Sequence, residues 1–188
     1  AYAAAVGSLK GPKHGGANIK VLEQLDYIKA NVRDWSNDVE LSELLRKIIR
    51  KEASDRSGLI YGMGHAVYTL SDPRATILKK TAFEMAKGTE FESQFELLNS
   101  IERLTPAIFN EETGSEKALC ANVDMYSGLC YRMLGIPEEI ATALFAVSRM
   151  AGWCAHRFEE KTTGQRIIRP AYKAISGQRA YVDIADRT

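Results

Sequence analysis

Apolar residues recur at intervals of three and four along most of this 188-residue chain, whereas runs that alternate apolar and polar residues are scarce. This spacing is typical of amphipathic α-helices, so the sequence predicts an all-α fold. The segments with this spacing are residues 18–32, 39–49, 73–88, 91–103, 122–135 and 137–158.

Residues that favour helix ends set several of these boundaries. Asp38 is a good N-cap for the second predicted helix, and Asp72 followed by Pro73 marks the start of the third. Thr105-Pro106 should end the fourth helix, because proline lacks the backbone N–H that an interior helical position donates.

Two stretches lie outside the helical pattern. A glycine-bearing loop is expected over residues 53–70, and in residues 161–188 glycine and proline interrupt short apolar runs. The second stretch is predicted to be an extended or irregular tail. Such a tail rarely buries itself, so we expect it to lie on an absent part of the same chain or on a partner subunit.

Composition narrows the class of protein. The chain is 45% hydrophobic and 26% charged, as in ordinary globular proteins, and 25 basic residues nearly balance 24 acidic residues. The net charge of +1 provides no strong field to attract nucleic acid or an anionic membrane. The longest apolar stretches, such as residues 140–147, are too short for a membrane span, which needs about 20 residues. We therefore expect neither a nucleic-acid partner nor a membrane span.

The cysteines and the first residues bear on the cellular compartment. The three cysteines are odd in number and form no Cys-x-x-Cys pattern, which supports neither a disulfide framework nor a thiol-rich zinc site. The first residues lack the basic-then-apolar layout of a signal peptide. The sequence therefore predicts a cytoplasmic protein.

Two of the three histidines lie in glycine-rich turns that lead towards helices. His14 stands in Gly-Pro-Lys-His14-Gly-Gly-Ala-Asn, and His65 stands in Gly-Met-Gly-His65-Ala-Val. Glycine lets a ligand approach the main chain closely, and histidine exchanges protons near neutral pH. Either could be an inert turn residue, but two such sites in one chain favour function. No His-Glu-x-x-His pattern accompanies them, so we expect no metal site.

Charged residues in the helical pattern give further candidates. Arg74 is predicted near a helix N-terminus, where the helix dipole disfavours a cation; it is either a surface residue or a partner of a bound anion. Arg149 lies in an apolar helical segment and, if buried, needs a structural carboxylate or an anionic ligand. Asp124 is expected in the first turn of a helix, where capping is the usual role. Beside two histidines it is also a candidate base with a raised pKa. His156 is predicted at a helix C-terminus, where its charge or N–H is favourable.

Four motifs, in this order, resemble the C-terminal half of the citrate synthase family, and the resemblance covers nearly all of this chain. Each contains one or more of the candidate residues above. The motifs are Gly-Pro-Lys-His14-Gly-Gly-Ala-Asn, Gly-Met-Gly-His65-Ala-Val-Tyr-Thr-Leu-Ser-Asp-Pro-Arg74, Asn-Val-Asp124-Met-Tyr-Ser-Gly, and Val-Ser-Arg149-Met-Ala-Gly-Trp followed by Arg-Ile-Ile-Arg169-Pro.

The resemblance implies an all-helical enzyme in which a small domain closes on a large one. Residues 1–14 would end a large-domain segment, residues 15–135 would form the small domain, and residues 136–188 would return to the large domain. Such an enzyme condenses acetyl-CoA with oxaloacetate to give citrate and CoA. The resemblance further implies a homodimer without a tightly bound cofactor or a metal.

The resemblance also implies roles for the catalytic residues. Asp124 would remove a proton from the methyl group of acetyl-CoA, and His14 would hold the resulting enol or enolate oxygen. His65 would donate to the oxaloacetate carbonyl oxygen as the carbon–carbon bond forms, and hydrolysis of citryl-CoA would follow.

Binding residues follow from the same resemblance. Arg74, Arg149 and Arg169 would bind the oxaloacetate carboxylates, the last of them across the dimer interface. The residues implied to contact CoA are Tyr61, Gly62, Met63, Gly64 and Lys117.

The sequence departs from the family pattern in two respects. The family's third active-site histidine belongs to an upstream segment that is absent here, and Ala171 stands where the family often has a second arginine. We therefore expect the chain to be inactive alone. Two alternatives stay open. One is a 2-methylcitrate synthase that uses propionyl-CoA, because one methylene gives only about 1–3 kcal/mol of discrimination. The other is a non-catalytic module that binds CoA or another subunit.

Overall fold

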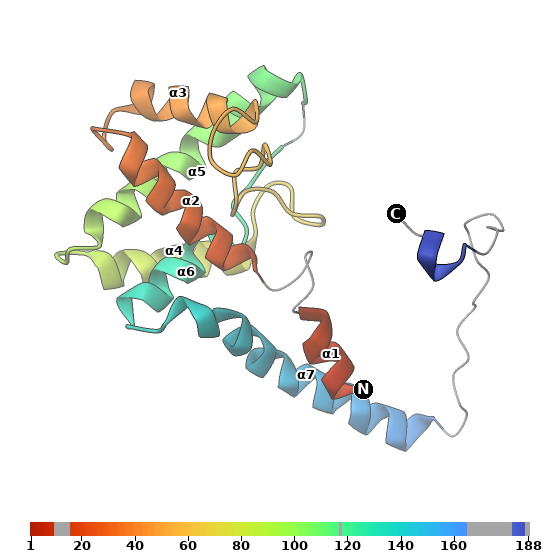
Figure 1. Ribbon diagram of the computed structural model, residues 1–188. Helices are drawn as coiled ribbons and strands as arrows, with labels where there is room; N and C mark the ends of the chain where they lie inside the picture. The colour runs from red at the N-terminus through yellow and green to blue at the C-terminus, as the bar shows by residue number, and fades with distance from the viewer. Residues whose placement is uncertain (10–15, 117, 165–181, 187–188) are drawn as a thin grey trace. The chain divides into compact units, whose positions relative to one another are not determined.

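The computed structural model describes residues 1–9, 16–116, 118–164 and 182–186. In these ranges the chain forms α-helices and two short 3-10 helices but no β-strand, which confirms the predicted all-α fold (Figure 1). The elements are α1 (Tyr2–Leu9), α2 (Ala17–Asn31), α3 (Asp38–Ile49), α4 (Pro73–Ala86), α5 (Glu92–Thr113), α6 (Asp124–Met133), η1 (Glu138–Ile140), α7 (Ala141–Thr163) and η2 (Ile184–Asp186).

The chain divides into two compact units, residues 1–151 and residues 152–188. The first unit contains α1 to α6, η1 and the beginning of α7. The second contains the remainder of α7 and η2. The domain boundaries implied by the resemblance, after residues 14 and 135, stay a prediction.

Helices α2 to α6 bury their apolar faces against one another in the first unit. α3 packs on α5, and α2 and α4 both pack on α6. Each leucine or isoleucine that is fully buried in this core contributes about 1.5–3 kcal/mol relative to exposure. Core side chains no more than 1% exposed include Leu25, Ile28, Leu41, Leu45, Ile48, Leu97, Leu98, Met125, Tyr126 and Leu129.

Asn37, rather than the predicted Asp38, caps α3. The side-chain oxygen of Asn37 accepts hydrogen bonds from the backbone N–H groups of Val39 and Glu40. Asp38 is the first helical residue, where a carboxylate suits the helix dipole, and it pairs with Arg103 of α5 at 2.7 Å. The predicted cap was wrong by one residue because Asn and Asp, which stand side by side here, are both favourable capping residues.

α5 continues through Pro106 to Thr113, so the predicted break at Thr105-Pro106 is wrong. A proline inside a helix costs roughly 3 kcal/mol. The apolar face nevertheless continues on both sides of it, because Ile101 and Ile108 are both buried. The Thr105 hydroxyl also donates to the Ile101 carbonyl at 2.6 Å. Packing of this face outweighs the backbone hydrogen bond that proline cannot make.

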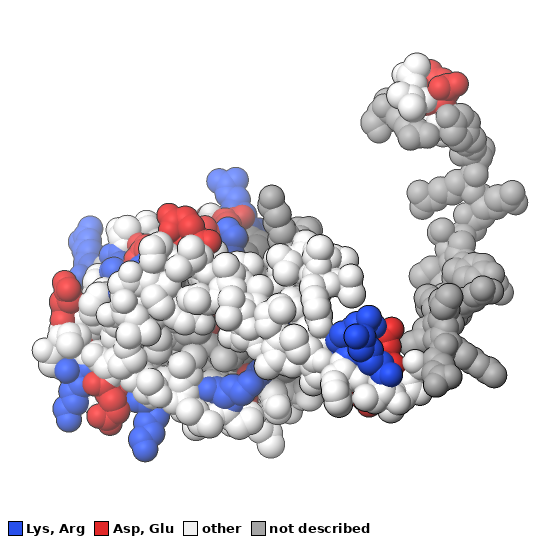
Figure 2. All heavy atoms as spheres, turned by 90° about the horizontal axis from the view of Figure 1, so that it is seen from below, with Lys and Arg blue, Asp and Glu red and all other residues white. Residues whose placement is uncertain are grey.

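α7 begins after η1 and ends at Thr163 rather than near Phe158. Ala141 is its one buried residue among those described, whereas the apolar Val147 and Phe158 are 67% and 70% exposed. Figure 2 shows one face of the molecule on which broad areas carry no Lys, Arg, Asp or Glu. No helix in the described ranges has both the length and the apolar character to cross a membrane.

Candidate active site

The turn that contains His65 is held against the segment that leads into α6. The backbone N–H of Gly64 donates to the Cys120 carbonyl at 2.7 Å, and the N–H of Asn122 donates to the Gly62 carbonyl at 2.8 Å. A β-bridge between residues 63 and 121 lies between these bonds. Two motifs that are far apart in the sequence are therefore joined by main-chain hydrogen bonds.

Gly62 allows this close approach. Its φ is +84°, a left-handed backbone conformation that residues with a side chain rarely adopt. Gly62 also packs directly on α6. A Cβ atom at this position would lie 2.9 Å from Cα of Met125 and 2.7 Å from its Sδ atom. Any side chain here would push the turn away from the helix that begins at Asp124.

Asn122 connects the two motifs through its side chain. Its Nδ2 donates to the Gly64 carbonyl at 2.9 Å, and its Oδ1 accepts from the backbone N–H of Asp124, also at 2.9 Å. One carboxamide thus fixes the backbone beside His65 and the backbone of Asp124. Sequence reasoning assigned no role to Asn122, although an Asn two residues before a helix start is a common local capping signal.

The backbone fixes the protonation pattern of His65. Nδ1 accepts hydrogen bonds from the N–H groups of Val67 and Tyr68, at 3.0 and 3.1 Å. An accepting Nδ1 needs its lone pair, so the proton of the neutral ring is on Nε2. Nε2 lies 3.2 Å from Nη2 of Arg74, and the ring also contacts Tyr68, with centroids 4.9 Å apart.

Arg74 is held by the residue that caps its own helix. Asp72, 1% exposed, accepts from the backbone N–H, Nε and Nη2 of Arg74 at 3.0, 3.0 and 2.8 Å. These bonds lower the pKa of the Asp72 carboxyl against the effect of burial. The anion expected near Arg74 is thus first of all Asp72. The Arg74 side chain is still 48% exposed, so it can also meet an external anion.

Asp124 begins α6 with a half-buried carboxyl. Burial raises the pKa of this carboxyl, and the nearby charge of Asp72 adds to the rise. The charges of Arg74 and His65 oppose it. The sequence-predicted residues His65, Arg74 and Asp124 therefore lie close enough for their charges to interact.

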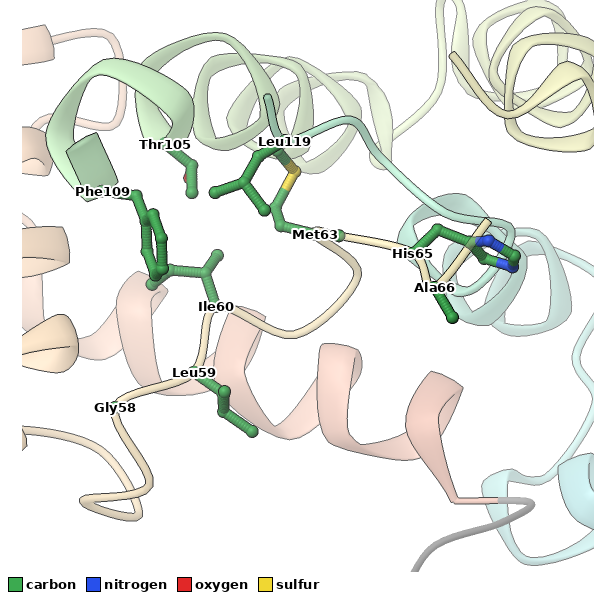
Figure 3. Close-up of a pocket in the computed structure, with 10 residues that line it drawn as sticks. Gly58, Leu59, Ile60, Met63, His65, Ala66, Thr105, Phe109 and Leu119 are labelled. Carbon is green, nitrogen blue, oxygen red and sulfur yellow. The ribbon is translucent and has the colours of Figure 1, made fainter. Parts of the chain in front are cut away.

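A pocket of about 350 Å³ adjoins this group (Figure 3). Figure 3 shows His65 and Ala66 at one end of it and Ile60 and Phe109 at the other. The residues that line it are Gly58, Leu59, Ile60, Met63, Gly64, His65, Ala66, Thr105, Phe109 and Leu119.

The four consecutive residues implied to contact CoA divide between two environments. Met63 and Gly64 line the pocket, whereas Gly62 is buried against Met125. The Tyr61 hydroxyl donates to a carboxylate oxygen of Asp55 at 2.6 Å. Burial and this hydrogen bond raise the pKa of Tyr61.

The remaining candidates lie elsewhere. Arg149 is exposed on α7, with its guanidinium carbon 4.2 Å from the centre of the Phe145 ring, so burial does not impose an anionic partner on it. His156 is in the interior of α7 rather than at its C-terminus, because the helix continues to Thr163. His14, Lys117 and Arg169 lie outside the described residues. The described ranges contain no group of three or more His, Cys, Asp or Glu side chains arranged to hold a metal ion.

Comparison with known proteins relates the chain to a family. The family model for the C-terminal domain of citrate synthase matches residues 1–171. The chain belongs to the citrate synthase family. The all-helical fold and the order of the four motifs agree with this assignment.

Curated citrate synthases match over nearly the whole chain. The enzyme of Acidithiobacillus ferridurans is 39% identical over 98% of this chain, and that of Thermoplasma acidophilum is 36% identical over 98%. The matches cover 44% and 45% of those proteins. The chain thus spans less than half the length of these citrate synthases.

Solved citrate synthase structures share the fold. The Thermoplasma acidophilum enzyme, in a ternary complex with carboxymethyl coenzyme A and oxaloacetate, has a TM-score of 0.69 and 33% identity. That match covers 99% of this chain and 46% of the other. The Pyrobaculum aerophilum citrate synthase has a TM-score of 0.67 and 31% identity, over 98% of this chain and 42% of the other.

Proposed function

We propose that the chain is the C-terminal part of a citrate synthase that condenses acetyl-CoA and oxaloacetate, with water, to citrate and CoA. The observation that carries this proposal is the pairing of His65 and Arg74. In the neutral ring, Nε2 of His65 carries a hydrogen that faces the N–H groups of Arg74 at 3.2 Å. Two donors this close attract an acceptor, and the carbonyl and carboxylate oxygens of a 2-oxo acid provide one for each.

Oxaloacetate binds, in this proposal, between these two donors. His65 donates its Nε2–H to the carbonyl oxygen that gains negative charge as the new bond forms. Arg74, held from behind by Asp72, binds a carboxylate. Arg149 and Arg169 bind the remaining carboxylate charge, and Arg169 does so across the interface of a homodimer.

Asp124 is the proposed base. It removes a proton from the methyl group of acetyl-CoA, and the pKa that burial raises makes it a better acceptor than an exposed carboxylate. His14 stabilises the enolate oxygen by hydrogen bonding. The nucleophilic carbon then attacks the oxaloacetate carbonyl carbon, and His65 supplies a proton to the new alkoxide. Water cleaves the thioester C–S bond of citryl-CoA and releases citrate and the CoA thiol.

The pocket beside His65 is the proposed site for part of CoA. Leu59, Ile60 and Phe109 give it an apolar wall, while the Met63 to His65 turn places main-chain groups at its edge. Lys117 is proposed to meet the CoA phosphates. The thioester end of the ligand is proposed to point towards Asp124.

Thiol release from acetyl-CoA and propionyl-CoA in the presence of oxaloacetate tests the proposal. The full-length gene product and the 188-residue chain are assayed in parallel. We expect the full-length product to use acetyl-CoA faster, and the 188-residue chain to release no thiol. Faster use of propionyl-CoA would identify a 2-methylcitrate synthase. Calorimetric binding of CoA without turnover by the full-length product would instead identify a binding module.

The proposed assembly is a cytoplasmic homodimer. Sedimentation of the full-length product measures its mass, and mixing an Arg169→Ala protein with an Asp124→Asn protein tests the shared site. If Arg169 acts in the partner's site, mixed dimers recover activity that neither variant has alone. A monomeric active enzyme would contradict this part of the proposal.

A further inference from the structure

Gln24 is a polar residue within the buried face of α2, and it is only 5% exposed. A buried carboxamide is stable only when its donor and its acceptor both have partners. Nε2 of Gln24 donates to the Leu59 carbonyl at 2.9 Å, and Oε1 accepts from the backbone N–H of Tyr61 at 3.0 Å. One side chain therefore binds the backbone on both sides of Ile60.

The backbone that Gln24 binds forms a wall of the pocket beside His65. Leu59 and Ile60 both line that pocket, and Figure 3 shows α2 passing beside them. Further along, the same loop is tied to residues 120–122 by main-chain hydrogen bonds. α2 therefore anchors this loop through Gln24, upstream of the anchor that residues 120–122 provide.

Loss of the carboxamide would leave two backbone groups without partners next to α2. The Tyr61 N–H and the Leu59 carbonyl would regain hydrogen bonds by moving out towards water. That movement would displace Ile60 and change the shape of the pocket. Within the described residues, no other side chain forms a hydrogen bond with these two groups.

We propose that Gln24 is a positioning residue that sets the shape of the acyl-CoA pocket by clamping Leu59 and Tyr61. The identity of the ligand rests on the proposed function, whereas the clamp itself does not. Loss of the clamp should weaken binding of the CoA thioester and leave the oxaloacetate site, formed around Arg74, nearly unchanged.

Two substitutions separate the hydrogen bonds from the volume of the side chain. Gln24→Met keeps a similar length without a donor or an acceptor. Gln24→Glu has the same shape as the amide, and its protonated form offers an O–H to Leu59 and an oxygen to Tyr61. Its ionised form only accepts, so it repels the Leu59 carbonyl. Gln24→Glu should therefore recover the clamp as the pH falls.

Amide hydrogen exchange at Tyr61 measures the clamp without any ligand. In the full-length gene product, Gln24→Met should reduce the protection factor of the Tyr61 amide by about tenfold or more. Gln24→Glu should show the same reduction at neutral pH and recover the protection at about pH 5. Asp55 and Lys20 carry charges that act on Tyr61, and the wild type at each pH controls for their titration.

Ile28→Val is the matched control for lost stability. Ile28 is fully buried one turn further along α2, and its apolar side chain can form no hydrogen bond with the loop. Tyr61 protection should fall in this variant only as far as global stability falls. For each variant, the loss of Tyr61 protection is compared with the loss of global stability. If this comparison gives the same result for Gln24→Met as for Ile28→Val, the clamp is overturned.

Kinetics of the same variants measure the consequence for the ligand. Gln24→Met should raise KM for acetyl-CoA about five- to fiftyfold, with kcat and KM for oxaloacetate within about twofold of wild type. Equal increases in both KM values would overturn the assignment to the acyl-CoA pocket. A wild-type protein that releases no thiol would contradict the proposed function, and the exchange measurement would still decide on the clamp.

Discussion

Nη2 of Arg74 lies 3.2 Å from Nε2 of His65, the nitrogen that carries the single hydrogen of the neutral imidazole. The opposite nitrogen, Nδ1, accepts from the backbone N–H of Val67 and of Tyr68. The backbone thereby keeps the hydrogen of the neutral ring on Nε2, the nitrogen that faces Arg74. These two nitrogens are the groups that we propose to bind the oxygen atoms of oxaloacetate.

The first prediction concerns the tautomer of His65. Nitrogen chemical shifts at alkaline pH should show a neutral ring with a lone pair on Nδ1 and hydrogen on Nε2. Oxaloacetate should then shift the Nε2 signal and leave Nδ1 nearly unchanged. His156, exposed on α7 with its Nδ1 3.8 Å from a carboxylate oxygen of Glu159, is the control, and its neutral ring should carry hydrogen on Nδ1 in part of the population. Hydrogen on Nδ1 of neutral His65 would contradict the assignment.

The second prediction concerns Asp124→Asn, which should have opposite effects on activity and stability. Loss of the proposed base should lower kcat by about 10²–10⁴-fold. Burial raises the pKa of Asp124 in the folded state, so the fold favours its protonated form. That stabilisation is complete below the unfolded-state pKa and is lost as the pH rises through the folded-state pKa. The Tm of the variant minus the Tm of wild type should therefore increase as the pH rises from about 4 to about 7.

Asp38→Asn provides a control with the opposite sign. Asp38 is also the first residue of its helix, so the helix-dipole contribution is matched. Hydrogen bonding to Arg103 lowers the pKa of Asp38, which gives stability above the unfolded-state pKa that is lost as the pH falls. The Tm of Asp38→Asn minus the Tm of wild type should thus decrease as the pH rises. Parallel trends for the two variants would show that burial of Asp124 has no net effect.

The third prediction concerns Asn122, whose carboxamide joins Gly64 to Asp124. Asn122→Ala should cost about 1–3 kcal/mol of unfolding free energy, because two partly buried backbone groups lose their partner. Asn122→Asp keeps the acceptor for Asp124 but adds a negative charge beside it. That charge should raise the pKa of Asp124 further and move the acid limb of the kcat profile to higher pH. An unchanged acid limb in Asn122→Asp would exclude electrostatic contact between the two residues.

The fourth prediction separates backbone strain from packing at Gly62. Gly62→Ala should lose about 1–2 kcal/mol for its positive φ and a further amount for contact with Met125. Gly88 has a φ of +72°, and a Cβ atom added there would meet nothing within 4 Å, so Gly88→Ala carries the φ cost alone. Urea unfolding of both variants gives the difference. Equal losses would mean that the turn can move away from α6 at no cost.

The sequence predicted both ends of α2 to within one residue, and the Asp72-Pro73 signal gave the correct start of α4. It failed at Pro106, because the local cost of proline is visible in the sequence whereas the buried partners of Ile108 are not. It also failed by one residue at the start of α3, where neighbouring residues compete to cap the helix.

The site was predictable only in part for a related reason. His65, Arg74 and Asp124 have side chains whose chemistry is conspicuous, and they stand in recognisable motifs. Gln24 and Asn122 have ordinary amides whose importance comes from partners 35 to 58 residues away. A contact over such a sequence distance exists only once the chain has folded, so Gln24 carried no local signal and the position of Asn122 before a helix indicated only its bond to Asp124.

The hydrogen bonds between the His65 turn and residues 120–122 also determine which segments must be moved together when the site is transferred to another protein. A designer who grafts the turn onto another helical scaffold must bring the Cys120 and Asn122 backbone with it, because Gly62 and Gly64 have their partners there. The same holds for recombination between homologues. Working hybrids should be those in which both segments come from the same parent, so crossovers should be placed before the His65 turn or after residue 122 rather than between the two.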